Sequence, residues 1–178
     1  MVERVTLVDG DDRSLGTMEK LQAHAEGRLH RAFSVFVFDG AGRLLLQRRA
    51  ASKYHSAGLW SNTCCGHPRP GEPVEVAAAR RLFEEMGLRT TLRPLFRFLY
   101  RAEIGPAMVE HEVDHVLAGR CADLPAPEPS EVQDWRWVTL DALGEEVARE
   151  PLAFTAWLRI LLGDAGHRRA LAEAGEKA

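Results

Sequence analysis

Residues 66–88 of the chain read GHPRPGEPVEVAAARRLFEEMGL, and this stretch is the most informative one for the fold. The part from Val74 to Met86 is rich in Ala, Arg and Glu, which favour a helix. Gly87 follows where a helix commonly ends, because glycine adopts the left-handed conformation of a C-cap at little cost. The sequence therefore predicts a loop, a helix over residues 74–86 and a turn.

Charged pairs occur on this predicted helix at a spacing of four residues. Arg80 and Glu84 form one pair and Arg81 and Glu85 the other, so the members of each pair share a helix face. A carboxylate placed there can hold Mg²⁺, while a guanidinium takes phosphate oxygens. For any one pair the alternative is an ordinary ion pair on an exposed helix.

The whole set of matches at fixed offsets argues against that alternative. The pattern is G-x5-E-x7-R-x-U-x-E-E-x-G-U, where U is a bulky aliphatic residue, and it is fitted by Gly66, Glu72, Arg80, Leu82, Glu84, Glu85, Gly87 and Leu88. This set resembles the Nudix box, which holds a divalent cation against a diphosphate. Hydrolases with this box carry Glu where this chain has Arg81. Losing that carboxylate weakens the metal cluster that activates water, so we expect the site to bind a diphosphate and cut it poorly.

A thiol and an imidazole precede the helix. Cys65 and His67 are two residues apart, so on an extended backbone their side chains point to the same side, while Cys64 points to the other. Such a pair can share a metal or a proton. A zinc or redox-thiol module built on Cys64, Cys65 and His67 is one reading, but the chain has no second Cys/His pair at zinc-finger spacing.

Other potential ligands lie on predicted elements elsewhere in the chain. His24 follows Lys20 by four residues on a predicted helix, and Glu110 and Glu112 alternate on a predicted strand and face the same way. Three imidazoles and two carboxylates would make a five- or six-coordinate site for a divalent ion. The predicted ligands are His24, His30, His67, Glu110 and Glu112, and the histidines left out are His55, His111, His115 and His167.

Strands and helices are predicted on both sides of the box. Asp39-Gly40 is a hairpin turn signal between strands over 31–39 and 43–48. Further strands are predicted over 95–101, 108–117 and 135–138, and helices over 17–26, 152–162 and from 164 onward, the last able to fray. This order predicts an α/β or α+β sandwich around a mixed sheet.

Bulk composition excludes several classes of protein. At 178 residues, with a net charge of −3, the chain is expected to be one domain, with no support for nucleic-acid or membrane binding. Because no apolar run of membrane-spanning length and no charged-then-apolar leader is visible in the chain, neither membrane insertion nor export is expected. Its three cysteines are expected to be free thiols in a reducing cytoplasm.

The chain from Lys20 to Trp157 resembles a specific family, the type I isopentenyl-diphosphate isomerases, which are Nudix-fold enzymes. Arg81, odd for a hydrolase, is what this family has. The matching motifs are Leu29-His30, Arg48-Arg49-Ala50-x-Ser52-Lys53, Gly58-x-Trp60-x-Asn62, Cys65-Gly66-His67-Pro68, Gly71-Glu72, Arg80-Arg81, Glu84-Glu85-x-Gly87, Tyr100-Arg101, Val109-Glu110-x-Glu112 and Phe154-x-x-Trp157. The resemblance implies one α/β/α sandwich domain with a mixed central sheet over 1–178.

It also implies conversion of isopentenyl diphosphate to dimethylallyl diphosphate. An alkene is a weak base, so such a site needs a positioned acid and must stabilise a cation without offering water as a nucleophile. By resemblance Cys65 and Glu112 transfer the protons on opposite faces of the substrate, and Tyr100 orients Glu112. Trp157 would present its ring to the cation, although a core anchor on an amphipathic helix is the alternative.

The remaining roles also follow from the resemblance. The five His and Glu ligands would hold Mn²⁺, Zn²⁺ or Mg²⁺, and Glu85 would hold a second Mg²⁺ with the substrate diphosphate. The diphosphate clamp would consist of Lys20, Arg49, Lys53 and Arg81. Arg48 would be either a clamp member or a strand-end charge. A Nudix hydrolase of a nucleoside or other diphosphate is the alternative function, and a monomer or weak dimer is expected.

Overall fold

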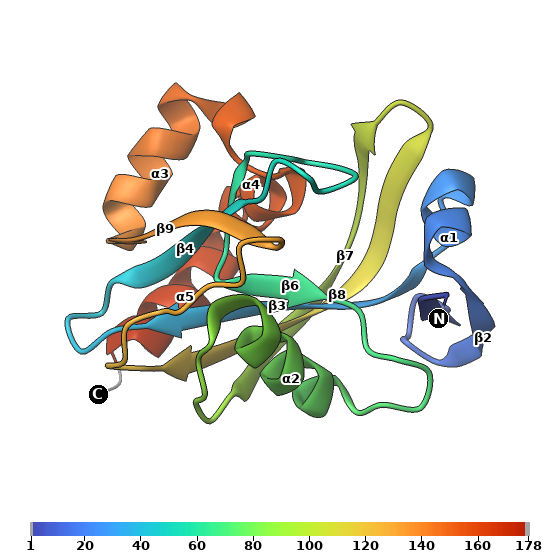
Figure 1. Ribbon diagram of the computed structural model, residues 1–178, viewed down its shortest axis with the longest axis horizontal. Coiled ribbons are helices and arrows are strands. Elements are labelled where there is room, and N and C mark those ends of the chain that lie inside the picture. Colours follow the sequence, from blue (N-terminus) through green and yellow to red (C-terminus); the bar gives the residue numbers. More distant parts are fainter. Residues whose placement is uncertain (1, 177–178) are drawn as a thin grey trace.

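The computed structural model describes residues 2–176. Its strands and helices follow one another along the chain as shown in Figure 1. The strands are β1 (Arg4–Val8), β2 (Ser14–Glu19), β3 (His30–Phe38), β4 (Leu44–Arg49), β5 (Trp60–Ser61), β6 (Cys64–Gly66), β7 (Arg93–Gly105), β8 (Met108–Arg120) and β9 (Val132–Val138). The helices are α1 (Lys20–Glu26), α2 (Val74–Met86), α3 (Leu140–Arg149), a 3-10 turn η1 (Pro151–Ala153), α4 (Ala156–Gly163) and α5 (Ala165–Glu176).

The strands form a mixed sheet centred on β3. This strand pairs in parallel with β8 and antiparallel with β1, β4 and β6. β7 pairs antiparallel with β8, and β9 and β5 pair antiparallel with β4. β3 is thus an interior strand of the sheet, and nearly all of its residues are buried.

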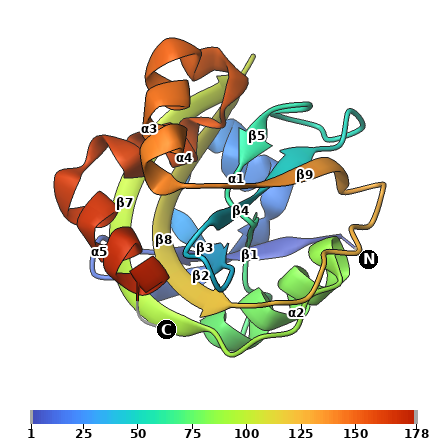
Figure 2. The same ribbon diagram turned by 90° about the vertical axis from the view of Figure 1, so that its left-hand side faces the viewer.

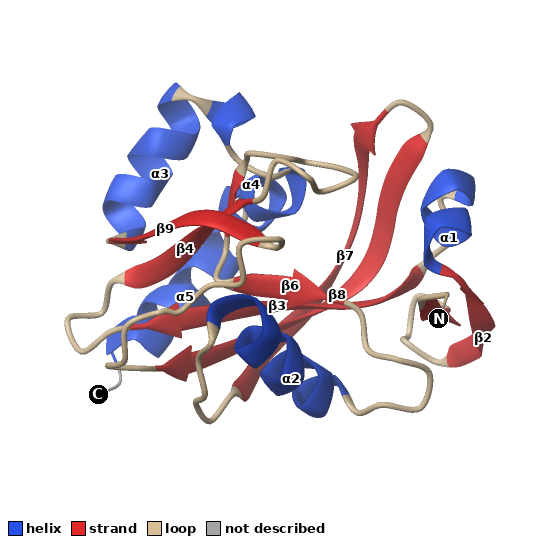
Figure 3. Ribbon diagram, viewed as in Figure 1, coloured by secondary structure: helices blue, strands red, loops and turns tan. Residues whose placement is uncertain are grey.

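Helices cover both faces of β3. Phe33, Val35 and Val37 point to one face, where they pack with Leu82 and Met86 of α2. The intervening side chains point to the opposite face, where Phe36 and Phe38 pack with Leu158, Leu161 and Leu171 of α4 and α5. Figures 2 and 3 show these helices on the two sides of the strands. The period-two pattern of one strand thus produces the predicted α/β/α sandwich.

Several predicted elements are confirmed. The helix over 74–86 has the predicted bounds, and Gly87 ends it with φ 67° while its N–H donates to the Phe83 carbonyl. A Cβ at Gly87 would lie 2.8 Å from the Ala126 carbonyl oxygen, so the position requires glycine for space as well as conformation. The hairpin at Asp39-Gly40 is also present, with the Asp39 carboxylate accepting from the N–H groups of Ala41 and Arg43.

Two predicted helices begin too early. Ser14–Glu19 form β2, which pairs with β1, and α1 starts only at Lys20, where the Glu19 carboxylate caps it. The helix predicted over 152–162 is broken at Thr155, whose N–H donates to the Trp60 carbonyl at 2.9 Å. In both cases a partner distant in sequence supplies the backbone hydrogen bonds, so local pattern favoured the wrong boundary. The strands β1, β5 and β6 and the helix α3 were not predicted.

The C-terminal segment is helical as far as the structure describes it. In α5 the side chains of Leu171 and Ala174 are buried against the sheet, and the predicted tail continues to residues 177–178, which lie outside the described residues. Among residues 2–176 no helix is long and apolar enough to cross a membrane.

Candidate active site

A cavity of about 710 Å³ lies where β6, the start of β8, α2 and the loop between β4 and β5 meet. It brings together nearly all predicted site residues. Those that line it are Lys20, Arg49, Lys53, Cys65, His67, Arg81, Glu85, Tyr100, Glu110, Glu112 and Trp157. His24 and His30 do not line it; both are fully buried, with ring nitrogens beside those of the lining residues.

The adjacent cysteines point in opposite directions. Cys64 packs into the core beneath α2, whereas Cys65 lines the cavity and packs against the core on the other side of the sheet. β6 fixes this arrangement, because Cys65 pairs directly with Ser34 of β3. Burial raises the pKa of the Cys65 thiol to about 12, despite the opposing charge of Arg49. At neutral pH the cavity therefore contains a protonated thiol.

Two carboxylates and a phenol form a second polar group in the cavity. Glu110 and Glu112 share one face of β8, and the Tyr100 hydroxyl lies 2.6 Å from Glu112 Oε2 and 3.0 Å from Glu110 Oε2. Burial and the charge of Glu112 raise the pKa of Glu110 well above its usual range. Burial acts in the same direction on Glu112, but the contacts of its carboxylate with the imidazoles of His30 and His67 outweigh burial and lower its pKa. The environment thus shifts the pKa values of the two carboxyl groups in opposite directions, and Glu112 is the one kept ionised.

Three imidazoles converge on Glu112. The Nδ1 atoms of His24 and His30 lie 2.7 and 2.8 Å from the carbonyl oxygens of Lys20 and Arg28, which can only accept, so both Nδ1 atoms carry the proton. This leaves each Nε2 with a lone pair. His30 Nε2 lies 3.2 Å from His67 Nε2, which in turn lies 2.9 Å from Glu112 Oε1.

This donor set fits a divalent cation. One ligand atom from each of His24, His30, His67 and Glu112 lies within 4.8 Å of the others. His24 Nε2 is buried and has no hydrogen-bond partner among residues 2–176. Burial, with the charge of His67, lowers the pKa of His24 to about 4, so this nitrogen stays unprotonated at neutral pH. A buried lone pair facing other lone pairs and a carboxylate is costly without a cation to receive them.

Most cations of the predicted diphosphate clamp are paired with carboxylates. Lys20 Nζ lies 2.6 Å from Glu3 Oε2, and Lys53 forms an ion pair with Glu131. Arg81 Nη2 lies 2.6 Å from Glu85 Oε1 and 3.2 Å from Glu131 Oε1. Glu3 and Glu131 were not predicted; Glu131 lies next to β9 and reaches the cavity only through the pairing of β9 with β4.

Arg49 differs from the other three clamp residues. Its side chain is buried, its Nε has no hydrogen-bond partner, and its guanidinium lies 5.3 Å from the centre of the Trp157 ring. The neighbouring Arg48 is exposed, donates to the Gly58 carbonyl at 2.9 Å and does not line the cavity. Successive side chains of β4 point to opposite faces, so of these two arginines only Arg49 points into the cavity.

Trp157 is held by polar contacts as well as by packing. Its indole N–H lies 3.1 Å from Ser61 Oγ and 3.0 Å from Asn62 Oδ1. The ring belongs to the core beneath α4 and also lines the cavity. Trp157 therefore contributes to the core and also lines the cavity, so its position is compatible with both predicted alternatives.

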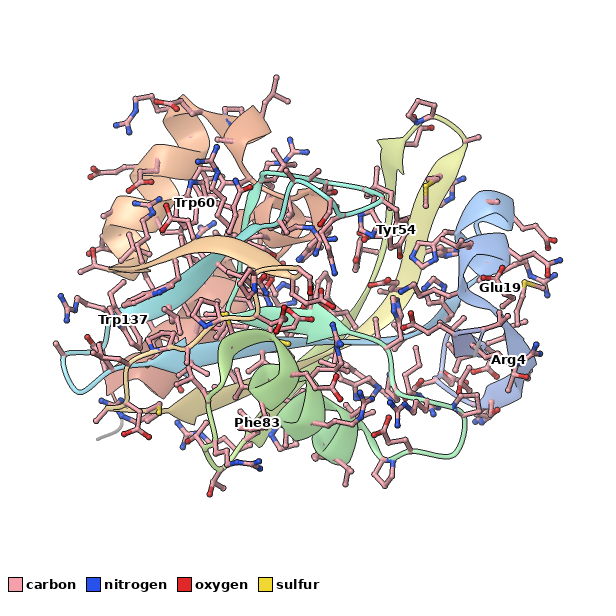
Figure 4. The ribbon with its side chains drawn as sticks, viewed as in Figure 1. Arg4, Glu19, Tyr54, Trp60, Phe83 and Trp137 are labelled. Carbon is pink, nitrogen blue, oxygen red and sulfur yellow. The ribbon has the colours of Figure 1, made fainter. Side chains whose placement is uncertain are left out.

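His55 lines the cavity although it was not among the predicted ligands. The loop between β4 and β5 brings His55 into the cavity, with its ring centre 6.0 Å from those of His24 and Trp157. The neighbouring Tyr54 also lines the cavity and lies at the inner end of that loop in Figure 4. No periodicity could have revealed either residue, because the loop is irregular. Two other excluded histidines contact groups outside the cavity: His111 the Gly27 carbonyl and His115 the Asp12 carboxylate.

The chain has a mixed sheet between helices and a Glu- and Arg-rich helix beside a cavity lined by both basic residues and glutamates. The NUDIX domain family matches residues 28–158, so the chain is a NUDIX domain protein. A protein from Deinococcus radiodurans has the same fold, with a TM-score of 0.76 at 23% identity over 90% of this chain and 98% of that one. A MutT protein from Methanosarcina mazei gives a TM-score of 0.63 at 18% identity over 84% of this chain and 96% of that one. These two likenesses concern the fold alone.

Relatives found by sequence similarity identify the family more specifically than the shared fold does. The isopentenyl-diphosphate Delta-isomerase of Burkholderia multivorans is 55% identical over 93% of this chain and 94% of the relative. The isopentenyl-diphosphate Delta-isomerase 2 of Aromatoleum aromaticum is 48% identical over 100% of this chain and 94% of the relative. The chain belongs to the isopentenyl-diphosphate Delta-isomerases of the NUDIX family.

Proposed function

We propose that the protein converts isopentenyl diphosphate to dimethylallyl diphosphate. The observation that carries this proposal is the presence, in the lining of one cavity, of a protonated thiol at Cys65 and an ionised carboxylate at Glu112 that Tyr100 holds by a 2.6 Å hydrogen bond. Cations suited to a diphosphate line the same cavity. Proton transfer and diphosphate binding thus have separate groups at one site.

The reaction moves a proton and leaves the diphosphate intact. The terminal alkene carbon gains a proton, a tertiary carbocation-like species forms, and the adjacent methylene loses a proton, so no net proton is consumed. Cys65 and Glu112 are the two proton-transfer groups, and Tyr100 is the positioning residue for Glu112. The Trp157 ring faces the developing cation, an interaction worth about 2 kcal/mol or more when desolvated. Its hydrogen bonds to Ser61 and Asn62 hold the ring in place.

Lys20, Arg49, Lys53 and Arg81 are the proposed diphosphate clamp. Binding of the diphosphate replaces carboxylates that neutralise Lys20, Lys53 and Arg81 in the described structure, while Arg49 already has an unpaired N–H. When bound, a Mn²⁺, Zn²⁺ or Mg²⁺ ion held by His24, His30, His67, Glu110 and Glu112, with Mg²⁺ at Glu85, would tune the acidity of Glu112 and offset the diphosphate charge.

Hydrolysis of a nucleoside or other diphosphate is disfavoured by Arg81. Its guanidinium lies 2.6 Å from Glu85, so a cation stands where a hydrolase needs a further carboxylate for metal. The proposal also includes a single domain over residues 1–178, a cytoplasmic location and a monomer or weak dimer that binds neither nucleic acid nor membrane.

One experiment separates isomerase from hydrolase. The protein is incubated with isopentenyl diphosphate and Mg²⁺, and the products are followed by proton NMR and by a phosphate assay. Dimethylallyl diphosphate without released phosphate is expected. Released phosphate in place of dimethylallyl diphosphate, or no reaction with this substrate, would refute the proposal.

A further inference from the structure

We propose that His55 is an additional ligand of the divalent ion at the His/Glu site, bound on the side of Glu110. The inference rests on the metal site of the proposed function and deepens it. The five predicted ligands leave a sixth position in an octahedral shell. His55 lies in an irregular loop, and its imidazole is brought to this site only by the folded structure.

The potential ligands fall into two overlapping groups. His24, His30, His67 and Glu112 form one group, whereas Glu110 is grouped with His24 and His55. Within each group the ligand atoms lie within 4.8 Å of one another. Opposite ligands of an ion with bonds near 2.1 Å are roughly 4.2 Å apart, so small movements would close either group around an ion.

His24 belongs to both groups, and this joins them into one site. Its Nδ1 is engaged by the Lys20 carbonyl at 2.7 Å, and its buried Nε2 has no partner. The Tyr100 hydroxyl also connects the groups, because it contacts both Glu110 and Glu112. Because His24 is common to both groups, an ion bound by it would be within reach of His30, His67 and Glu112 as well as of His55 and Glu110.

The His55 side chain is held facing this position. It is only 7% exposed, and its Nδ1 lies 4.0 Å from Glu110 Oε1. Its ring packs edge-on against Tyr54 at 4.5 Å, and its carbonyl accepts from Arg49 Nη2 at 3.3 Å. Nδ1 also lies 3.3 Å from Ser56 Oγ, a long contact that an ion could displace.

Backbone strain accompanies this arrangement. Ser56, the residue after His55, has φ 50°, in the left-handed region that is unfavourable for a residue other than glycine. Strain of this kind persists where the surroundings impose it, commonly at functional sites. The alternative is that the His55 ring only packs against Tyr54 and Trp157 and binds nothing.

The test measures metal binding without any substrate. Mn²⁺ affinity of the metal-free protein is measured by electron paramagnetic resonance of free Mn²⁺, for the wild type, His55→Phe and His55→Ala. His55→Phe keeps a ring against Tyr54 and Trp157 but removes both nitrogens. Both variants are expected to weaken binding by about 10-fold or more, on the scale of lost interactions around metal sites. His167→Phe is the matched control, since His167 stacks on Phe96 at 4.4 Å and does not line the cavity, and the affinity of this variant for Mn²⁺ should be unchanged.

A second readout reports the coordination shell itself. The visible spectrum of the Co²⁺-loaded protein depends on coordination number, so it should change in both His55 variants. Free imidazole should restore the wild-type spectrum in His55→Ala, which has room for it, but not in His55→Phe. Wild-type affinity and spectrum in His55→Phe would overturn the inference and leave the isomerase proposal standing. A wild-type protein that binds no divalent ion would overturn both the inference and the metal site on which it rests.

Discussion

Replacing Tyr100 with Phe removes one buried hydroxyl from the centre of the proposed acid–base group. The hydroxyl donates to Glu112 Oε2 at 2.6 Å, with Glu110 Oε2 at 3.0 Å. The ring itself is unchanged, and its stacking on Phe98 at 5.3 Å is retained. The substitution therefore tests the hydrogen bond and leaves the core packing in place.

The magnitude follows from the type of bond that is lost. A hydrogen bond to a charged group contributes about 1.5–3 kcal/mol. Since about 1.4 kcal/mol corresponds to a factor of ten, kcat should fall roughly 10- to 150-fold if the bond positions Glu112 in the transition state. KM should change little, because Tyr100 is not one of the cations that would bind the diphosphate.

The assay is the initial rate of dimethylallyl diphosphate formation, followed by NMR over a range of substrate concentrations. Tyr54→Phe is the matched control, because Tyr54 is the other of the two tyrosines and also lines the cavity, without a carboxylate contact like that of Tyr100. A kcat within twofold of wild type for Tyr100→Phe, with the fold intact by circular dichroism, would refute the positioning role.

Other consequences can be measured with single substitutions or by changing the solution. Cys65→Ala should abolish isomerisation but retain binding of inorganic diphosphate by calorimetry, and full activity would contradict its role. Cys64→Ala should keep substantial activity, because Cys64 faces the core beneath α2; a loss equal to that of Cys65→Ala would contradict the opposite facing of the two thiols. A chelator should remove activity and added divalent metal restore it, whereas activity that survives thorough metal removal would count against the His/Glu site. Burial raises the pKa of Asp114 to about 8, so its carboxyl stays protonated in the folded chain while the unfolded chain ionises near pH 4. Stability should therefore fall as pH rises from about 4 to 8. Asp114→Asn, which can still accept from Ser34, should raise the free energy of unfolding at pH 7 by roughly 1–4 kcal/mol with little effect near pH 4; equal effects at both pH values in thermal unfolding would disprove this.

The pattern of residues along the chain predicted the elements that neighbouring residues alone stabilise. The bounds of helix α2 follow from local sequence, since its Ala-rich interior favours a helix and Gly87 ends it. The helix at Thr17 was misplaced because β1 supplies the hydrogen bonds that make Ser14–Glu19 a strand. The short strands β5 and β6 likewise depend on partners in β4 and β3, which no local signal reveals.

The site was predicted to the extent that its residues occur in recognisable motifs. Residues such as Cys65, Glu112 and Arg81 are marked by their neighbours in sequence. Glu131 and His55 lie in no such motif: each reaches the cavity from an irregular segment, and each contacts a residue distant in sequence, Lys53 and Trp157 respectively.

The amino-acid sequence by itself determined which chemical groups this protein has and which of them share a face of one strand or helix. Residue spacing does this directly, because the periods of strands and helices are set by the backbone. Only the tertiary structure decided how groups from different elements meet and which protonation states they hold. The parallel pairing of β3 with β8 places His30 opposite Glu112, and β6 then brings His67 to the same carboxylate. Burial in that arrangement keeps the Cys65 thiol protonated and leaves His24 Nε2 without a partner, and His55 entered the site by the same route.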